Sequence, residues 1–415
     1  MKNTVSLTVL AGVCLPLPAL ALGLRVADQD AAATARGNAF AATADNPSAI
    51  YYNPAGISQL EGTQARANFY GISLESTYTA PGPGGAQTKT KSRLQGIPDF
   101  YFTTALKSAP VTFGVGVFAP YGLGVEWPDS TAAFRATKGE LAYYSFTPVV
   151  AWKPHKTFSI AAGPTINYAN TEFQQSVLPR PFPLLQTRLR GEGTDLGFVA
   201  GAQWKPVPKH AFGLSYRSAT TIDFKGSLDA PDPTAPFTAR VSAPANARIK
   251  FPQHLIAGWS YRPTPAWNLE VNVDWTDWSR LQKVDVKSNG ATVSTLPFNW
   301  RNSLFYEFGV TRYFDKGWHA SAGYIFSENS VPDATLNPIV PDSDRHIFSI
   351  GGGRNYQKWR WDLAYQLAYG PARTVTGNNY TLADTTGPGT GFSAPANGTF
   401  EFLSHALALS VGYNF

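Results

Sequence analysis

The residue types that usually carry catalysis are present in this sequence, but they are not spaced for it. The six histidines are dispersed, no H-x-x-x-H or H-E-x-x-H pair occurs, and the G-x-S-x-G nucleophile motif is absent. Gly351-Gly352-Gly353 lacks the Lys-Ser/Thr of a phosphate-binding loop. Asp274 and Asp277 are three apart in a strand-like run, so they point to opposite faces and form no dyad. We therefore predict no enzymatic activity, no catalytic residue, no metal site and no cofactor.

The composition points instead to a membrane protein built from strands. Only 15% of the 415 residues are charged, against about a quarter in soluble domains, while 43% are hydrophobic and 13% aromatic. After the first two dozen residues, no apolar run reaches the ~20 residues of a membrane helix, and the mean hydropathy is −0.17. A transmembrane β-barrel fits these values. The net charge of +6 is scattered without a basic run, so we expect no nucleic-acid partner.

The N-terminal residues 1–21 have the pattern of a signal peptide. Lys2 precedes the apolar stretch from Val5 to Leu17, and Ala19-Leu20-Ala21 is an A-x-A cleavage site. The only cysteine, Cys14, would leave with this segment, so the mature chain would hold no disulfide. A lipidated Cys14 is the alternative, but the apolar residues that follow it fit that poorly.

Large apolar residues alternate with small or polar ones in several segments, which is typical of strands between lipid and a lumen. The apolar sets face lipid, and their polar partners, Glu270, Asp274 and Asp362 among them, need a wet or plugged lumen because lipid cannot satisfy them. The three clearest apolar sets are Trp267, Leu269, Val271, Val273 and Trp275; Trp359, Trp361, Leu363, Tyr365 and Leu367; and Leu407, Leu409, Val411, Tyr413 and Phe415.

The connections alternate between short and long, as in outer-membrane barrels. Six short turns and seven long Pro/Gly-rich loops join fourteen antiparallel strands, which we assign to residues 64–415. The short turns are predicted at 107–110, 153–156, 205–209, 262–265, 314–317 and 356–358. The long loops are predicted near 80–92, 127–139, 171–189, 226–248, 287–297, 327–343 and 371–399.

Residues 22–63 do not alternate and are predicted to form a partly helical hatch that plugs the lumen. The stretch from Ala27 to Ala44 is rich in alanine and permits helix. Asn46-Pro47 and Asn53-Pro54 are turn signals. A barrel of fourteen strands is too wide to be filled by its own side chains, so it has room for such a plug. A mobile periplasmic tail is the alternative.

Several segments, in order along the chain, resemble the FadL family of outer-membrane transporters for hydrophobic compounds, which includes toluene and xylene uptake proteins. They are Arg36-Gly37-Asn38-Ala39-Phe40, Asn53-Pro54-Ala55, Tyr216-Arg217-Ser218, Ile222 to Gly226, Trp275 to Ser279, Val331-Pro332 and Pro341 to Arg345. The resemblance implies a fourteen-stranded barrel in the outer membrane of a Gram-negative cell. It also implies a hatch whose motif is Asn53, Pro54 and Ala55.

The third strand, Val111 to Glu126, is interrupted at Ala119, Pro120, Tyr121 and Gly122. Pro120 cannot donate to the ladder, and Gly122 permits a bend. The resemblance implies an inward kink here that opens the barrel wall, so that a hydrophobic solute leaves sideways into the bilayer. An ordinary bulge is the alternative.

Two further sets of residues are candidates for collecting the solute and for anchoring the hatch. Apolar residues of the third and fourth long loops could form an external collection groove: Leu178, Phe182, Leu184, Leu185 and Phe237. Loop-on-loop packing would explain them equally well. Asp342, Asp344 and Arg345 are candidates for anchoring the hatch, or they are a charge cluster at a strand end.

The substrate is predicted to be a hydrophobic small molecule, with long-chain fatty acids preferred and monoaromatic hydrocarbons as the alternative. Fatty-acid carriers of the family present cations near the end of strand five and before strand ten. Here these stretches, Glu172 to Gln175 and Thr295 to Pro297, contain no Lys or Arg. A general porin and an outer-membrane lipase are the rival classes. Outer-membrane lipid and lipopolysaccharide are the expected surroundings, and we expect a monomer.

Overall fold

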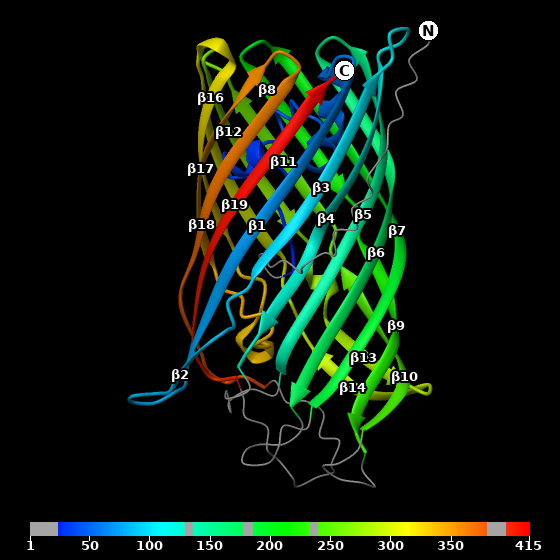
Figure 1. Cartoon of the computed structure of the whole chain (residues 1–415), viewed down its shortest axis with the longest axis vertical. Helices are drawn as coiled ribbons and strands as arrows, with labels where there is room; N and C mark the ends of the chain where they lie inside the picture. Colours follow the sequence, from blue (N-terminus) through cyan, green and yellow to red (C-terminus); the bar gives the residue numbers. More distant parts are fainter. Residues whose placement is uncertain (1–23, 129–135, 177–185, 233–239, 380–395) are drawn as a thin grey trace, which may run out of the picture.

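The computed structural model describes residues 24–128, 136–176, 186–232, 240–379 and 396–415. Within these ranges, nineteen strand segments form one antiparallel sheet that closes through β1 and β19 into a barrel of fourteen wall strands (Figure 1). Ten wall strands are single segments: β1 (Thr63–Thr79), β3 (Leu94–Ala105), β4 (Val111–Glu126), β5 (Ala136–His155), β6 (Phe158–Ser176), β7 (Gln186–Val207), β16 (Trp318–Ser327), β17 (Arg345–Tyr356), β18 (Trp359–Val375) and β19 (Gly398–Asn414).

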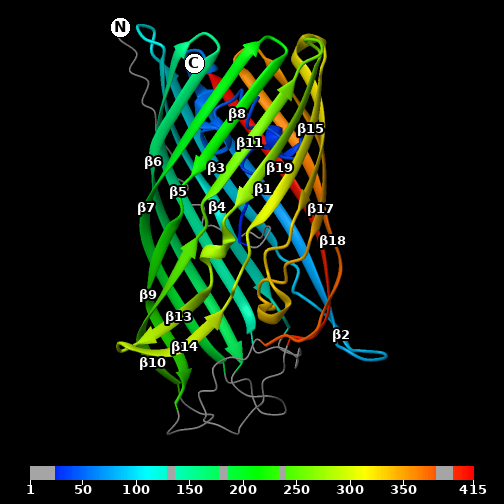
Figure 2. The same cartoon turned by 180° about the vertical axis from the view of Figure 1, so that it is seen from behind.

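The other four wall strands each consist of two segments. They are β8 (His210–Arg217) with β9 (Thr220–Pro231), β10 (Arg240–Phe251) with β11 (His254–Tyr261), β12 (Trp267–Thr276) with β13 (Lys283–Ser288), and β14 (Ala291–Pro297) with β15 (Ser303–Tyr313). Figure 2 shows β9, β10, β13 and β14 on the side of the barrel away from β1. The short β2 (Gln87–Lys89) extends β1 into the first long loop.

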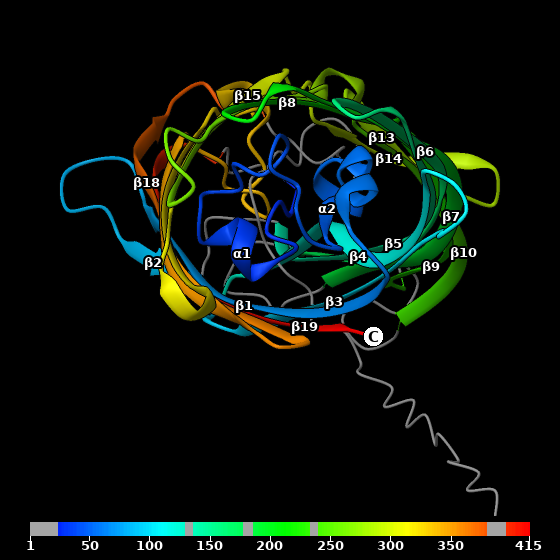
Figure 3. The ribbon, with the colours of Figure 1, turned by 90° about the horizontal axis from the view of Figure 1, so that it is seen from above.

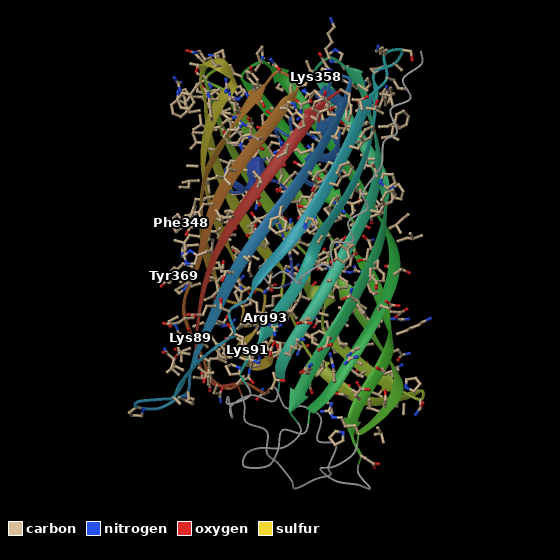
Figure 4. The ribbon with its side chains drawn as sticks, viewed as in Figure 1. Lys89, Lys91, Arg93, Phe348, Lys358 and Tyr369 are labelled. Atoms are coloured by element: carbon tan, nitrogen blue, oxygen red, sulfur yellow. The ribbon has the colours of Figure 1, made fainter. Side chains whose placement is uncertain are left out.

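The alternation in sequence sets the two faces of the wall. In β19, Leu407 and Leu409 are 59% and 49% exposed, whereas Ala408 and Ser410, which alternate with them, are buried. Asp362 in β18 and Glu270 in β12 are also buried, on the lumen side of their strands. Phe348 and Tyr369 project from the outer wall (Figure 4). The predicted apolar outer face is therefore that of the folded barrel, whereas the inner face is polar around the hatch and apolar toward the loops.

The two ends of the barrel differ as the connection lengths predict. All six predicted short turns join wall strands at one end. One predicted long loop, 287–297, is wrong. There β13 and β14 continue and are joined by Asn289-Gly290, whose φ angles of 50° and 82° suit a tight hairpin. Lys89, Lys91 and Arg93 lie toward the loop end, and Lys358 lies at the short-turn end (Figure 4).

The hatch lies inside the barrel near its short-turn end, as Figures 1 and 3 show. It contains α1 (Ala31–Thr34), α2 (Ala49–Tyr52) and the 3-10 helix η1 (Pro54–Gln59). The alanine-rich stretch forms only the four-residue α1, because Gly37 and Asn38 follow with φ angles of 60° and 56°. Three more 3-10 helices lie in connections: η2 (Trp278–Arg280), η3 (Asp315–Gly317) and η4 (Asp333–Thr335). No helix of the described ranges is long and apolar enough to span a membrane.

Candidate functional site

The Asn53-Pro54-Ala55 turn fixes the hatch to the barrel wall. The Asn53 carboxamide accepts from the Ala55 backbone N–H at 3.2 Å and donates to the carbonyls of Ala41, at 2.8 Å, and Ala202 in β7, at 3.0 Å. Pro54 begins η1, where its missing N–H costs nothing. Asn53 thus caps a helix and joins two parts of the hatch to β7 at once.

The hatch backbone approaches the wall closely because glycines line its seat. A Cβ atom added at Gly213 would lie 2.1 Å from the Ala41 carbonyl oxygen. One added at Gly323 would lie 2.0 Å from the Gly37 nitrogen, and one at Gly309 would lie 2.5 Å from the Arg36 oxygen. No side chain fits at these distances, so the wall glycines give the hatch backbone direct contact with several strands.

Buried ion pairs hold the first helix of the hatch. Arg66 in β1 pairs with Asp30, the N-cap of α1, and with Asp362 in β18 at 2.7 Å. Asp362 also contacts His319 Nε2 at 2.8 Å and Arg360 at 3.0 Å. Arg66, Asp30 and Asp362 are each at most 1% exposed. A buried charge is costly without partners, so this network determines where α1 docks.

Two more wall carboxylates bind hatch residues. Glu270 accepts from the backbone N–H groups of Ala42, at 2.7 Å, and Thr43, at 3.1 Å. Asp274 pairs with Arg25 at 2.5 Å, and Arg25 also donates to Thr276 Oγ1 at 2.9 Å. Burial, the largest single influence, would by itself lower the pKa of Arg25, but Asp274 together with Tyr51 and Tyr121 raises it above its ordinary value.

The three residues predicted to anchor the hatch contact other parts of the chain. Asp342 pairs with Arg345 at 3.0 Å, and Asp344 accepts from the Asn329 N–H at 2.8 Å. The Arg345 guanidinium lies over the Phe402 ring. These contacts brace the connection between β16 and β17, and an effect of this cluster on the hatch stays a prediction. Sequence reasoning missed Arg66 and Asp30, although it placed Asp362, Glu270 and Asp274 on the lumen face.

The third wall strand, β4, loses its neighbour halfway along. Its pairing with β3 runs from Thr112 to Val117 and ends there. Its pairing with β5 continues but shifts register between Phe118 and Tyr121. The irregularity in the pairing with β5 therefore lies at Ala119 and Pro120, two of the four residues named from the sequence, and pairing resumes at Tyr121 and Gly122. A role of these residues in solute exit stays a prediction.

An N-terminal arm of the hatch, residues 24–29, takes the place of β3 along the freed edge of β4. The Val26 N–H donates to the Pro120 carbonyl at 2.9 Å, and the Gly122 N–H donates to the Leu24 carbonyl at 2.8 Å. The Gln29 carboxamide bonds with both the N–H and the carbonyl of Ala119, at 3.2 and 3.0 Å. The arm satisfies backbone groups that could find no partner in lipid.

Two apolar hollows lie on either side of this part of β4. A cavity in the loop half of the lumen has empty space of about 520 Å³, its opening included, and its exposed lining is entirely apolar. A groove in the wall at the break holds Pro98 of β3, Ala119 and Gly122 of β4, and Tyr144 of β5. Leu141 of β5 lines both hollows. Leu24 of the arm lines the inner cavity.

Other predicted features lie outside the described residues. These are the signal peptide (1–21) and the external groove residues Leu178, Phe182, Leu184, Leu185 and Phe237. Within the described ranges, no group of three His, Cys, Asp or Glu side chains could hold a metal ion.

The fold and this site define an outer-membrane barrel of fourteen strands that is plugged by its own N-terminal segment. Comparison with known proteins gives the family: residues 12–415 match the family described as outer membrane protein transport protein (OMPP1/FadL/TodX). The chain belongs to this family. It is a transport protein of the outer membrane and not an enzyme.

The relatives are distant in sequence but similar in fold. The long-chain fatty acid transport protein of Escherichia coli K12 is 21% identical over 75% of this chain and 79% of its own length. A putative outer membrane protein of Neisseria meningitidis serogroup B is 23% identical over 95% of each chain. The crystal structure of a Pseudomonas aeruginosa FadL homologue superposes with a TM-score of 0.80 at 20% identity, covering 95% of this chain and 100% of that one. The Pseudomonas putida toluene transporter TodX gives 0.72 at 14% identity, with the same coverage.

Proposed function

We propose that this protein takes up long-chain fatty acids through the inner cavity and releases them sideways through the break in β4. The observation that carries the proposal is the position of Leu141, which lines both the apolar cavity in the lumen and the groove in the wall. Tyr121 lines the groove, and Leu123 of β4 and Leu24 of the hatch arm line the cavity. A solute that passes this point reaches the bilayer without entering the periplasm.

The physical need for such a path follows from the outer membrane itself. An apolar solute gains roughly 25 cal/mol for each Å² that leaves water, yet lipopolysaccharide prevents its direct entry into the bilayer. A protein path must therefore stay apolar from the outside to the exit. Leu178, Phe182, Leu184, Leu185 and Phe237 would collect the solute outside.

Release requires the hatch to move. In the structure, Leu24 and Val26 are bonded to the edge of β4 and fill the inner side of the break. We propose that a shift of the hatch, transmitted through Asn53 to Ala55, withdraws this arm and connects cavity and groove.

Uptake of a monoaromatic hydrocarbon is the second candidate. The cavity lining supports it, because the exposed lining is apolar throughout and none of its residues is a cation. A neutral aromatic solute needs no charged partner and would fit the same volume.

A disulfide across the arm tests the sideways exit. Leu24→Cys with Gly122→Cys places two cysteines on directly opposite antiparallel residues, whose Cα atoms are about 5.5 Å apart in such pairs, within disulfide range. The sequence otherwise holds only Cys14. We expect the oxidised variant to take up neither labelled oleate nor labelled toluene, in cells without other carriers. The reduced variant should take up its substrate, and the preferred solute identifies the substrate class.

The reduced form is the matched control, since it carries the same substitutions. Equal uptake by the oxidised and reduced forms, with the crosslink confirmed by mass spectrometry, would refute the exit at β4. If both forms lose uptake, the same assay on Leu24→Cys and Gly122→Cys separately shows which substitution is responsible. If cells without the protein take up both solutes as fast as cells with it, the transport proposal as a whole is refuted.

A further inference from the structure

Arg217, the last residue of β8, is a buried cation without a hydrogen-bond acceptor. It is 6% exposed, and all three of its guanidinium nitrogens lack an acceptor among the described residues. The guanidinium instead lies over two aromatic rings: its central carbon is 5.5 Å from the centre of the Tyr51 ring and 5.0 Å from that of the Phe118 ring. Aromatic faces attract a cation, but they do not replace the acceptors that the N–H groups need in the plane of the guanidinium.

Three other buried arginines of the lumen have the carboxylate partner that Arg217 lacks, and a fourth, Arg36, donates to Thr311 Oγ1 at 3.2 Å. Arg25 pairs with Asp274, Arg66 pairs with Asp30 and Asp362, and Arg345 pairs with Asp342. Each of these leaves one nitrogen unpaired, whereas Arg217 leaves all three. Because removing a charge from water is costly unless a partner replaces the water, this site favours an anion that the chain itself does not supply.

The surroundings of Arg217 contain no spare carboxylate to serve as that partner. Its cross-strand neighbour His254 is 2% exposed and has an unpaired Nδ1. The nearby phenols are already engaged, since Tyr121 donates to the Pro252 carbonyl at 2.9 Å and Tyr143 bonds with Thr220 Oγ1 at 2.9 Å. Asp274 of β12, the strand next to β11, is held by Arg25.

The location connects this cation with the solute path. Phe118, which Arg217 covers, is the last residue of β4 before the break. Tyr121 and Tyr143, which pack ring against ring at 5.1 Å, line the wall groove. The guanidinium therefore lies on the lumen side of the break.

We propose that Arg217, supported by His254, binds the carboxylate of an amphipathic ligand at the inner mouth of the break. The inference rests on the proposed transport function and deepens it, because it names the side chain that would recognise the anionic head group of the long-chain solute. Two parallel N–H donors of a guanidinium match the two oxygens of a carboxylate. The chain would lie in the apolar cavity while the head group is held.

Binding of two probes that differ only in the head group tests this assignment. Purified full-length barrel in neutral bicelles is titrated with oleate and with oleyl alcohol. The wild type should prefer oleate. In Arg217→Met, oleate binding should weaken roughly 10- to 100-fold, as expected for lost charge-assisted hydrogen bonds, while oleyl alcohol binding changes less than about twofold. Arg354→Met is the matched control, because Arg354 also lies over two aromatic rings, those of Trp318 and Tyr356.

A purely structural role for Arg217 predicts a different result. If the guanidinium only clamps Phe118 and Tyr51, the substitution should weaken both probes equally, and this outcome overturns the proposal. Unchanged oleate binding overturns it as well. Should Arg217→Met fail to fold, Arg217→Gln keeps a planar donor without charge and must lose the preference for oleate. A wild type that binds oleyl alcohol and oleate equally refutes this inference alone, whereas one that binds neither refutes the transport function.

Discussion

The two halves of the lumen are built on opposite physical principles. Around the hatch, buried charges and backbone hydrogen bonds join the plug to the wall, with Arg66, Glu270 and Asp274 as the main wall residues. Toward the loops, the lumen is lined by apolar side chains around an open cavity. Polar contacts are directional and fix one position, whereas apolar contacts tolerate different shapes. The polar contacts thus hold the plug in one register, whereas the apolar contacts of the loop half impose no single geometry.

The arm is where the halves meet. Arg25 belongs to the polar set through Asp274, while its neighbour Leu24 lines the apolar cavity. A change in the hatch half can therefore reach the cavity through one residue. The following three predictions act on one half and leave the other intact, and they are arranged by expected effect.

The largest effect is expected from Arg66→Met, which breaks the polar half. It leaves Asp30 and Asp362 buried without their shared cation, and removing one partner of a buried pair costs about 3–5 kcal/mol. We expect the hatch to undock and the barrel to leak. Single-channel conductance in planar bilayers and trypsin cleavage within the hatch measure this. Arg248→Met, which removes an exposed arginine paired with Asp223, is the control. A closed, protease-resistant Arg66→Met barrel would show that the remaining contacts hold the hatch without this ion pair.

A smaller effect is expected from Ala247→Trp, which fills the apolar half. Ala247 lines the cavity, so the indole would occupy the solute's volume, while overpacking costs about 1–3 kcal/mol. Uptake of labelled oleate should fall severalfold with no increase in conductance. Ala245→Trp, two residues away in β10 and not among the cavity lining, is the matched control. Equal loss in both variants would indicate a general defect of the strand instead of a blocked cavity.

The sequence predicted the wall much better than the site. Alternation places Glu270, Asp274 and Asp362 on the lumen face because the strand period is two and one face must meet lipid. The break in β4 was located because proline and glycine act locally. The partners of these residues could not be predicted, since pairing Arg66 with Asp30 depends on how a non-alternating segment folds within the barrel. Glycines at lumen positions, such as Gly213 and Gly323, were a signal of close backbone approach that sequence reasoning did not use.

The smallest effect is expected from Asp28→Asn in the hatch, which sharpens the comparison by removing one charge without removing its bonds. Burial raises the pKa of Asp28 above its ordinary 3.8, although hydrogen bonds from Asn38 and Gln366, both 2.9 Å, oppose the rise. The docked carboxyl thus keeps its proton to a higher pH than the undocked one, so docking weakens as the pH rises from 3.8 through the raised pKa.

An asparagine carbonyl can accept the same two bonds without charge. Asp28→Asn should therefore strengthen docking at pH 7 and flatten the difference between pH 4 and pH 7. The urea concentration at which the hatch becomes protease-sensitive, compared at both pH values, measures this. Weaker docking of the variant at pH 7 would mean that the two donors favour the ionised carboxylate more than burial disfavours it. The polar half would then be held by charge even where no cation is paired with it.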